Sequence, residues 1–217
     1  MTPKPTSAAD PTPLRLVIVS MDTHLASATA RARKVLAREM PGLTLSLHAA
    51  SEFAGHPAAL ARCKADIEQA DIVVAGMLFL EDHFLPILDD LRARSDRCDA
   101  MICLMSASEV VKLTRLGHFD MGKPASGPMA LLKKLRGGKD KAATGGAAQM
   151  KMLRRIPGLL RFIPGTAQDV RAYFLTLQYW LGGSDENMLN LVRHVVDRGA
   201  EGPRRVLRGS TRVEPPI

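Results

Sequence analysis

The chain has 217 residues, of which 46% are hydrophobic and 24% are charged, and its formal net charge is +8. This length and composition are typical of soluble proteins with a real core, and the three cysteines, with no C-x-x-C pair, exclude a disulfide framework and a cysteine zinc site. No apolar run reaches the ~18 residues that a membrane span needs, and the proline-rich start lacks the apolar centre of a secretory signal, so we expect a cytoplasmic protein with no transmembrane segment.

The first 136 residues alternate between strand and helix patterns. Residues 1–13 are expected to be disordered. Four apolar, β-branched or alternating runs are predicted as strands: Leu14–Ser20, Leu43–Ala49, Asp71–Met77 and Asp99–Met105. The segments between and after them are predicted as helices: Thr23–Glu39, Pro57–Gln69, His83–Arg94 and Ser106–Leu116. This alternation predicts an α/β fold, with a doubly wound, mostly parallel four-stranded sheet in a Rossmann-like domain over residues 14–136.

The pattern changes in the second part of the chain. Residues 137–148 are rich in glycine and predict a flexible loop, whereas residues 149–200 predict a helical extension. In that extension we expect a basic amphipathic segment, a helix capped by Thr166, and a last helix that starts at Ser184 or Asp185 and ends near Arg198. Residues 201–217 show no periodicity and are interpreted as a linker to further domains.

Ligands of open α/β sheets bind beyond the carboxyl ends of the strands, where the winding reverses. The side chains expected there as candidates are Asp22, His24, Glu81 and His83. The simpler interpretation is that Asp22, Thr23 and Ser106 cap helices, with Ser106 and Glu109 forming a capping box, while the acidic pair Glu81 and Asp82 favours a helix start. A metal site is the least favoured interpretation, and no phosphate-binding fingerprint follows the first strand. We assign no catalytic residue and no metal ligand.

The positive charge is concentrated in one stretch. Residues 133–161 contain nine basic residues and one acidic residue, which equals the whole net charge. The candidates within it for binding a carboxylate ligand, or for an interdomain contact, are Lys133, Lys134, Arg154, Arg155 and Arg161. A solvated or interdomain surface, an acidic partner, and nucleic acid or an anionic membrane stay open as alternatives. Nucleic acid is disfavoured because stacking aromatics are not interleaved with the basic residues.

Four separated motifs carry a resemblance to a known family. They are Met21–Ala26 (MDTHLA), Phe79–Leu88 (FLEDHFLPIL), Met129–Gly137 (MALLKKLRG) and the run Gln149–Trp180. In this order they resemble the N-terminal part of the H subunit of magnesium chelatase, the porphyrin-binding large subunit of chlorophyll and bacteriochlorophyll synthesis. The resemblance covers about residues 14–200. Members of that family are several times longer than this chain, so we expect a fragment whose metal-insertion residues lie beyond Ile217 and which is inactive alone.

The resemblance implies an enzyme of the ligase type that inserts Mg²⁺ into protoporphyrin IX. Mg²⁺ and protoporphyrin IX are then substrates, and ATP is hydrolysed on an AAA+ motor subunit that works with a bridging subunit. It also implies a phototrophic bacterium and a cytoplasmic location, with peripheral association with the photosynthetic membrane left open. Three alternatives remain: a stand-alone tetrapyrrole carrier or regulator, a relative of the cobalt chelatase large subunit, and a basic RNA-binding α/β protein.

Overall fold

The computed structural model describes residues 11–123, 155–161 and 163–217. The strands are β1 (Leu14–Ser20), β2 (Leu43–Ala49), β3 (Ile72–Gly76), β4 (Ala100–Leu104), β5 (Arg115–Leu116) and β6 (Phe119–Asp120). The α-helices are α1 (Ala26–Glu39), α2 (Pro57–Gln69), α3 (Glu81–Ser95), α4 (Ser108–Val111), α7 (Thr166–Gly182) and α8 (Asp185–Gly199), and residues 155–160 are also helical. Two 3₁₀-helices span Ala50–Glu52 and Gly202–Leu207.

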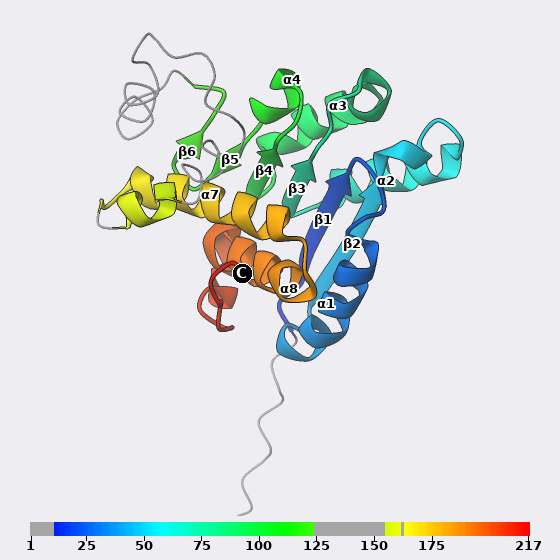
Figure 1. The fold of residues 1–217 in the computed structure, drawn as a ribbon. Coiled ribbons are helices and arrows are strands. Elements are labelled where there is room, and N and C mark those ends of the chain that lie inside the picture. Colours follow the sequence, from blue (N-terminus) through cyan, green and yellow to red (C-terminus); the bar gives the residue numbers. More distant parts are fainter. Residues whose placement is uncertain (1–10, 124–154, 162) are drawn as a thin grey trace, which may run out of the picture.

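The strands form one sheet in the order β2-β1-β3-β4-β5-β6 (Figure 1). The first four strands are parallel, with Leu16 of β1 opposite Leu45 of β2 and Ile72 of β3. The α/β class and the mostly parallel sheet are therefore confirmed, and β1 and β2 have the predicted bounds. The chain runs from β1 outward to β2 and then back past β1 to β3, so the winding reverses between β1 and β3.

The two faces of the sheet bury different helices. Alternate residues of β1 point to opposite sides: Leu16 and Ile18 join a core with α1, α7 and α8, whereas Val17 and Val19 join a second core with α2 and α3. Because both faces are covered, the central strands read as continuous apolar runs in the sequence. This burial on both faces explains why the strands were predictable.

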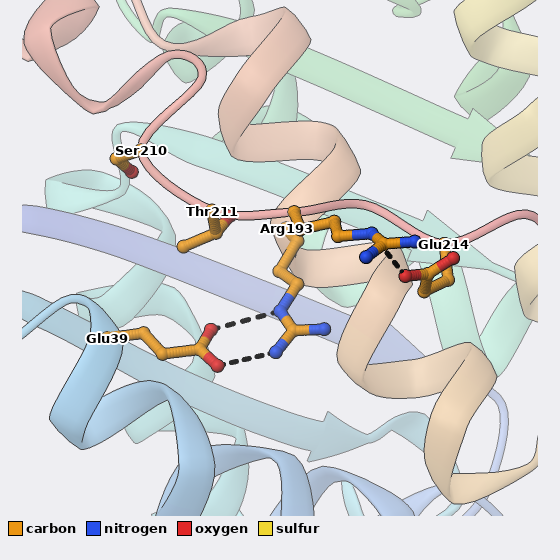
Figure 2. A pocket seen from close by; sticks show the side chains of 6 residues that line it. Glu39, Arg193, Ser210, Thr211 and Glu214 are labelled. Atoms are coloured by element: carbon orange, nitrogen blue, oxygen red, sulfur yellow. Dashed lines mark hydrogen bonds and ion pairs between the residues drawn. The ribbon is translucent and has the colours of Figure 1, made fainter.

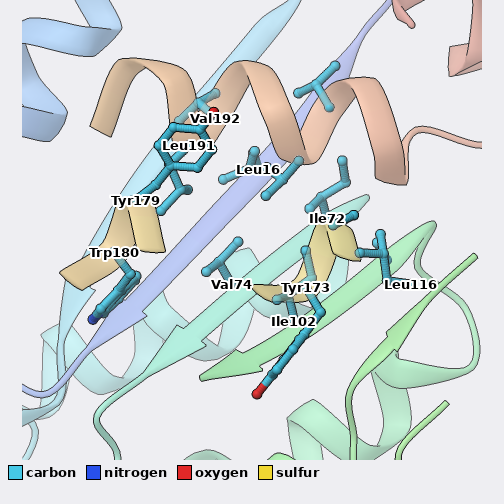
Figure 3. Close-up of a cluster of buried hydrophobic side chains, with 14 of the residues drawn as sticks. Leu16, Ile72, Val74, Ile102, Leu116, Tyr173, Tyr179, Trp180, Leu191 and Val192 are labelled. Atoms are coloured by element: carbon cyan, nitrogen blue, oxygen red, sulfur yellow. The ribbon is translucent and has the colours of Figure 1, made fainter. Parts of the chain in front are cut away.

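Helices α7 and α8 pack on the same face of the sheet as α1. Figure 3 shows Tyr179 and Trp180 of α7 and Leu191 of α8 over strand residues that include Leu16 and Val74. Helix α8 packs closely against β4: a Cβ built on Gly199 of α8 would lie 2.9 Å from the Cβ of Ala100 in β4. The segment expected as a helical extension thus contributes much of one of the two cores.

The helix expected over Ser106–Leu116 is wrong for most of its length. Only α4, four residues long, is helical, and its N-cap is Ala107. The Thr114 hydroxyl accepts a hydrogen bond from the Cys103 amide at 3.1 Å, which holds the chain beside β4. The chain then turns through Gly117, which has a φ of +57°, to form the antiparallel hairpin of β5 and β6. This hairpin extends the expected four strands to six in the described part of the chain.

Two helix starts also differ from prediction. Helix α1 begins at Ala26 with Leu25 as its N-cap, so neither Asp22 nor Thr23 caps it. Helix α7 begins at Thr166, but its N-cap is Gly165 and it has no side-chain cap. The start of α8 is confirmed: the Ser184 hydroxyl accepts a hydrogen bond from the Asn187 amide at 3.2 Å.

Residues 201–217 lie against the domain. The carboxamide of Asn187 bonds both the amide and the carbonyl of Ile217, at 3.1 and 3.2 Å. The Asn190 side chain accepts a hydrogen bond from the Glu214 amide at 2.9 Å, and the Tyr179 hydroxyl donates to the Glu214 carbonyl at 2.5 Å. Asn187 and Asn190 are buried on α8 and provide the polar partners that an extended backbone needs.

An ion-pair cluster fixes the start of this segment at the amino ends of β3 and β4. The Arg204 guanidinium bonds both carboxylate oxygens of Asp99 at 2.7 Å and lies 3.3 Å from Asp71. Hydrogen bonding to Asp99 raises the pKa of Arg204 above its ordinary value. Asp99 also accepts the amide of Glu201 at 2.8 Å. The cluster therefore ties the 3₁₀-helix Gly202–Leu207 to the sheet.

We expect Arg204→Ala to lower the free energy of unfolding by about 2 kcal/mol, because it leaves Asp99 and Asp71 largely buried without their cation. The Arg204 side chain is 24% exposed, which keeps the loss below that of a fully buried pair. Arg205→Ala is the matched control: this neighbour is 65% exposed and pairs with Glu201, so its loss should stay under about 1 kcal/mol. Urea unfolding of both variants measures the difference, and equal losses would contradict the assignment.

Candidate functional site

The loop after β1 brings two of the expected candidates together at the carboxyl end of the sheet. The Asp22 carboxylate accepts the backbone amide of His24 at 2.9 Å and also contacts the His24 ring. These hydrogen bonds hold the pKa of Asp22 below its ordinary value of 3.8. A carboxylate with a lowered pKa is a weaker base than an ordinary aspartate. The pair therefore orients the loop, with the His24 ring edge-on to Trp180 at a centroid distance of 6.3 Å.

The other two candidates lie in the first turn of α3, after β3. Glu81 is exposed, and together with Asp82 it places negative charge at the start of the helix, as expected. His83 is buried, and its Nδ1 has no hydrogen-bond partner within the part of the chain that the structure describes. Over the same residues, no group of three or more histidine, cysteine, aspartate or glutamate side chains could hold a metal ion.

Ser106 has a role other than the predicted capping box. Its hydroxyl accepts the amide of Leu78 and donates to the carbonyl of Leu104, both at 3.0 Å. The loops after β3 and β4 are thereby joined. The Glu109 carboxylate accepts a hydrogen bond from the Ser108 hydroxyl at 3.1 Å. In a capping box it would accept the backbone amide of Ser106 instead. The predicted box is wrong because a contact 28 residues away competes for the same hydroxyl.

The described part of the basic stretch is an amphipathic helical turn. Ile156 and Leu160 are buried in the core with α7, whereas Arg155 and Arg161 are exposed. The side-chain amide of Gln168 in α7 donates to the carbonyls of Leu160, Arg161 and Ile163. The turn thus presents Arg155 and Arg161 outward. Lys133, Lys134 and Arg154 lie outside the described residues.

Arg171 is a basic residue of this region that the sequence did not indicate. Its Nε donates to the Pro157 carbonyl at 3.1 Å, which ties α7 to the basic turn. Burial, and then the positive charges of Arg198 and Arg161, lower the pKa of Arg171. An anion bound near Arg171 would offset the effect of these two positive charges on it. In the sequence, Arg171 is one arginine among apolar neighbours, with no local signal.

The aromatic side chains of α7 are mostly in the core. Tyr173, Tyr179 and Trp180 are at most 7% exposed, and the Tyr173 hydroxyl donates to the Cys103 carbonyl at 3.1 Å. The Trp180 ring lies directly on Gly76 at the end of β3. These three rings are therefore core residues and are not available to stack on a flat ligand from outside.

A hollow of about 440 Å³ lies between α1, α8 and the C-terminal segment (Figure 2). Glu39, Arg193, Arg212 and Glu214 line it together with Ser210 and Thr211. Its two arginines are paired with its two carboxylates: Arg193 Nε lies 3.0 Å from Glu39, and Arg212 Nε lies 2.6 Å from Glu214. With its charges compensated, the hollow has no net attraction for an anion.

Within the described residues, no helix is both long and apolar enough to cross a membrane. Residues 15–174 match the family described as "Domain of unknown function (DUF3479)". The chain belongs to the DUF3479 family. The match includes the parallel sheet, the loops at its carboxyl end, and the start of α7 up to Phe174.

Curated relatives of this DUF3479 chain have the name expected from the four motifs. The chain is 51% identical over 183 residues to the magnesium-chelatase H subunit from Cereibacter sphaeroides, and 48% identical over 186 residues to that from Rhodobacter capsulatus. The chloroplastic magnesium-chelatase ChlH subunit from Oryza sativa subsp. indica is 33% identical over 134 residues. The first two matches cover 84% and 86% of this chain but 15% and 16% of those relatives, in their N-terminal part. The chain is thus similar to one end of a much longer protein.

Proposed function

We propose that this chain acts as the N-terminal part of the H subunit of a magnesium chelatase. In this proposal the complete H protein binds protoporphyrin IX, and the assembly inserts Mg²⁺ while ATP is hydrolysed on an AAA+ motor subunit that a bridging subunit connects to it. The observation that carries the proposal is the 51% identity to a named H protein of the chelatase over 84% of the chain. We place metal insertion in the remainder of the complete H protein, of which this chain matches about 15%. In this proposal the part of this chain is to bind and to position.

The basic turn is the part of the fold best suited to the two propionate groups of a porphyrin. Arg155 and Arg161 are exposed on a turn that Gln168 and Arg171 hold in place. Guanidinium groups pair with carboxylates through two parallel hydrogen bonds, which gives orientation as well as affinity. The positive charges of Arg198 and Arg161, which help to lower the pKa of Arg171, add to the attraction for a dianion near Arg171. We therefore infer that Arg155, Arg161 and Arg171 contact the propionates.

Replacing Arg155 and Arg161 together by alanine is expected to raise the Kd for protoporphyrin IX about tenfold, which corresponds to about 1.4 kcal/mol. Binding can be followed through the emission of Trp180, the single tryptophan, which a bound porphyrin quenches. Arg205→Ala/Arg212→Ala is the matched control: it removes two arginines from the C-terminal segment, at 65% and 87% side-chain exposure.

The porphyrin dimethyl ester gives a second control because it lacks both carboxylates. It should bind the original chain and the Arg155→Ala/Arg161→Ala variant with equal Kd values. If that variant binds protoporphyrin IX as tightly as the original chain, the propionate assignment is wrong. If the original chain gives no quenching with either porphyrin, this domain does not hold the macrocycle alone.

A further inference from the structure

The loops after β3 and β4 form one rigid unit at the carboxyl end of the sheet (Figure 1). The Met77 amide donates to the Leu104 carbonyl at 3.1 Å, and the Ala107 amide donates to the Leu78 carbonyl at 2.9 Å. The Ser106 hydroxyl adds the two bonds described above. Three of these four hydrogen bonds connect the two short loops, and the bond from Ser106 to Leu104 lies within the second loop. Such a unit can bind a partner with little loss of conformational freedom.

Two residues of this unit have left-handed backbone conformations although neither is glycine. Met77 has a φ of 62° and Met105 a φ of 42°. They occupy equivalent positions, each directly after its strand, because Gly76 is paired with Leu104 in the sheet. A non-glycine residue in this region costs of order 1 kcal/mol or more, and it persists only where the surroundings fix it. The hydrogen bonds between the loops fix it here, and after Met77 the chain places Leu78 in the core and leaves Phe79 and Leu80 exposed.

The unit exposes large apolar side chains. Phe79 is 51% exposed, Leu80 53%, Leu85 53% and Met105 38%, and we call these four residues the carboxyl-end patch. Phe79 follows Met77 in a tight turn, in which its amide donates to the Met77 carbonyl at 3.1 Å. Leu85 lies one turn after Glu81 on α3, so the two share one side of that helix. Exposed large apolar side chains on two joined loops and the first turns of the adjoining helix are typical of a binding surface.

Acidic residues surround the carboxyl-end patch. Glu81 and Asp82 form the first turn of α3, and Glu109 lies in the first turn of α4. In the two segments 77–85 and 104–112 they are opposed by one lysine, Lys112, and by the buried His83. These two segments are therefore net negative in a chain whose net charge is +8, with Arg92 of α3 as a further positive charge that acts on Glu109. An acidic border repels the propionates of a porphyrin and the head groups of an anionic membrane, and it attracts a basic protein surface.

We propose that the carboxyl-end patch docks a partner subunit of the chelatase assembly through a segment that presents an apolar side chain flanked by lysine or arginine. The inference rests on the proposed function for the presence of such subunits, but it concerns a different face of the domain from the basic turn. Phe79, Leu80 and Met105 supply the apolar contact area, and Glu81, Asp82 and Glu109 supply the complementary charge. Apolar anchors dominate the affinity of such interfaces, whereas charges at the border affect the association rate and its salt dependence.

The test measures binding of the 217-residue chain to the purified AAA+ motor subunit and, separately, to the bridging subunit, by isothermal titration calorimetry. Phe79→Ser/Leu80→Ser is expected to weaken binding to one of them at least about tenfold. Glu81→Lys/Asp82→Lys is expected to weaken it as well and to reduce its dependence on salt. Leu85→Ser, on the exposed side of α3, is a single-site variant that tests the patch without touching the loops.

The matched control is Val35→Ser/Val206→Ser, which removes two exposed apolar side chains, 41% and 68% exposed, elsewhere on the surface. It should bind as the original chain does. The patch variants should keep the porphyrin quenching of the original chain, which separates this inference from the proposed role of the basic turn. Failure of both partners to bind the original chain, or unchanged binding by all the patch variants, would overturn the inference even if porphyrin binding is found.

Discussion

Replacing Trp180 by alanine is expected to lower the free energy of unfolding by about 3–5 kcal/mol, the usual range for emptying the volume of a large aromatic side chain in a core. Trp180 is 2% exposed, and its ring lies so close to Gly76 that a Cβ there would overlap it. The substitution breaks no hydrogen bond of the ring, because Nε1 has no partner among the described residues. Urea unfolding followed by far-ultraviolet circular dichroism measures the loss, since the variant has no tryptophan left.

The contact between Trp180 and Gly76 can be tested by combining substitutions at both positions. Gly76→Ala alone should cost about 1–3 kcal/mol, because the added methyl group forces the indole ring out of its place. In the Trp180→Ala background the same methyl group meets an empty volume, so most of that cost should disappear. Val206→Ala, at a site 68% exposed, is the control and should change stability by less than about 0.5 kcal/mol. An equal cost of Gly76→Ala in both backgrounds would contradict the contact.

Much of the sheet could be predicted because the physical cause of its strands is local. A parallel strand buried on both faces must be apolar at successive positions, and Leu14–Ser20 shows this directly. The place of Leu43–Ala49 at the edge of the sheet is likewise visible in its alternation, since its face away from the core is partly exposed. Helix α2 follows from Pro57 at its first position. These elements need no information from distant residues.

The errors come from contacts between residues far apart in the sequence. Ser106 followed by Glu109 is a valid capping pattern, but the Leu78 amide takes the hydroxyl. Thr114 bonds back to Cys103 and prevents a longer helix, which leaves two strands of two residues each, too short for any periodicity. The packing of α7 and α8 on the sheet also depends on tertiary contacts, because an apolar helix face does not say which surface it will cover.

The candidate site was also predictable only where its features depend on nearby residues. That Asp22 and His24 meet at the carboxyl end of β1 could be predicted, because both follow a strand whose end is known. The position of Arg171 beside the basic turn could not be predicted, because it depends on the hydrogen bond to the Pro157 carbonyl, 14 residues away in the sequence. The carboxyl-end patch was likewise invisible in the sequence. Phe79 and Leu80 look like core residues there, and only the turn after Met77 places them outside.

The stability of the domain is expected to fall by about 3 kcal/mol as the pH is lowered from about 7 to about 4, because of His194 alone. This histidine of α8 is 5% exposed, and its ring contacts the Ala172 carbonyl at 3.1 Å. Burial lowers its pKa from 6.5 to about 4, against the smaller opposing effect of that hydrogen bond. Arg198 and Arg171 also lower the pKa, whereas Asp197 raises it. The neutral ring is therefore the form that the folded core accepts.

The direction of this pH effect follows from the difference in proton binding between the folded and the unfolded chain. Between pH 6.5 and about 4 the unfolded chain binds a proton at His194 that the folded chain does not, so acid shifts the equilibrium toward unfolding. His194→Gln can retain a donor to the Ala172 carbonyl and does not titrate, so it should be less stable at pH 7 but lose less stability on acidification. Urea unfolding at intervals of about half a pH unit, followed by Trp180 emission, measures both slopes. Parallel slopes for the two proteins between about pH 6.5 and 4.5 would show that His194 is protonated in the folded chain as readily as in the unfolded one. Its contact with Ala172 would then have to accommodate a charged ring.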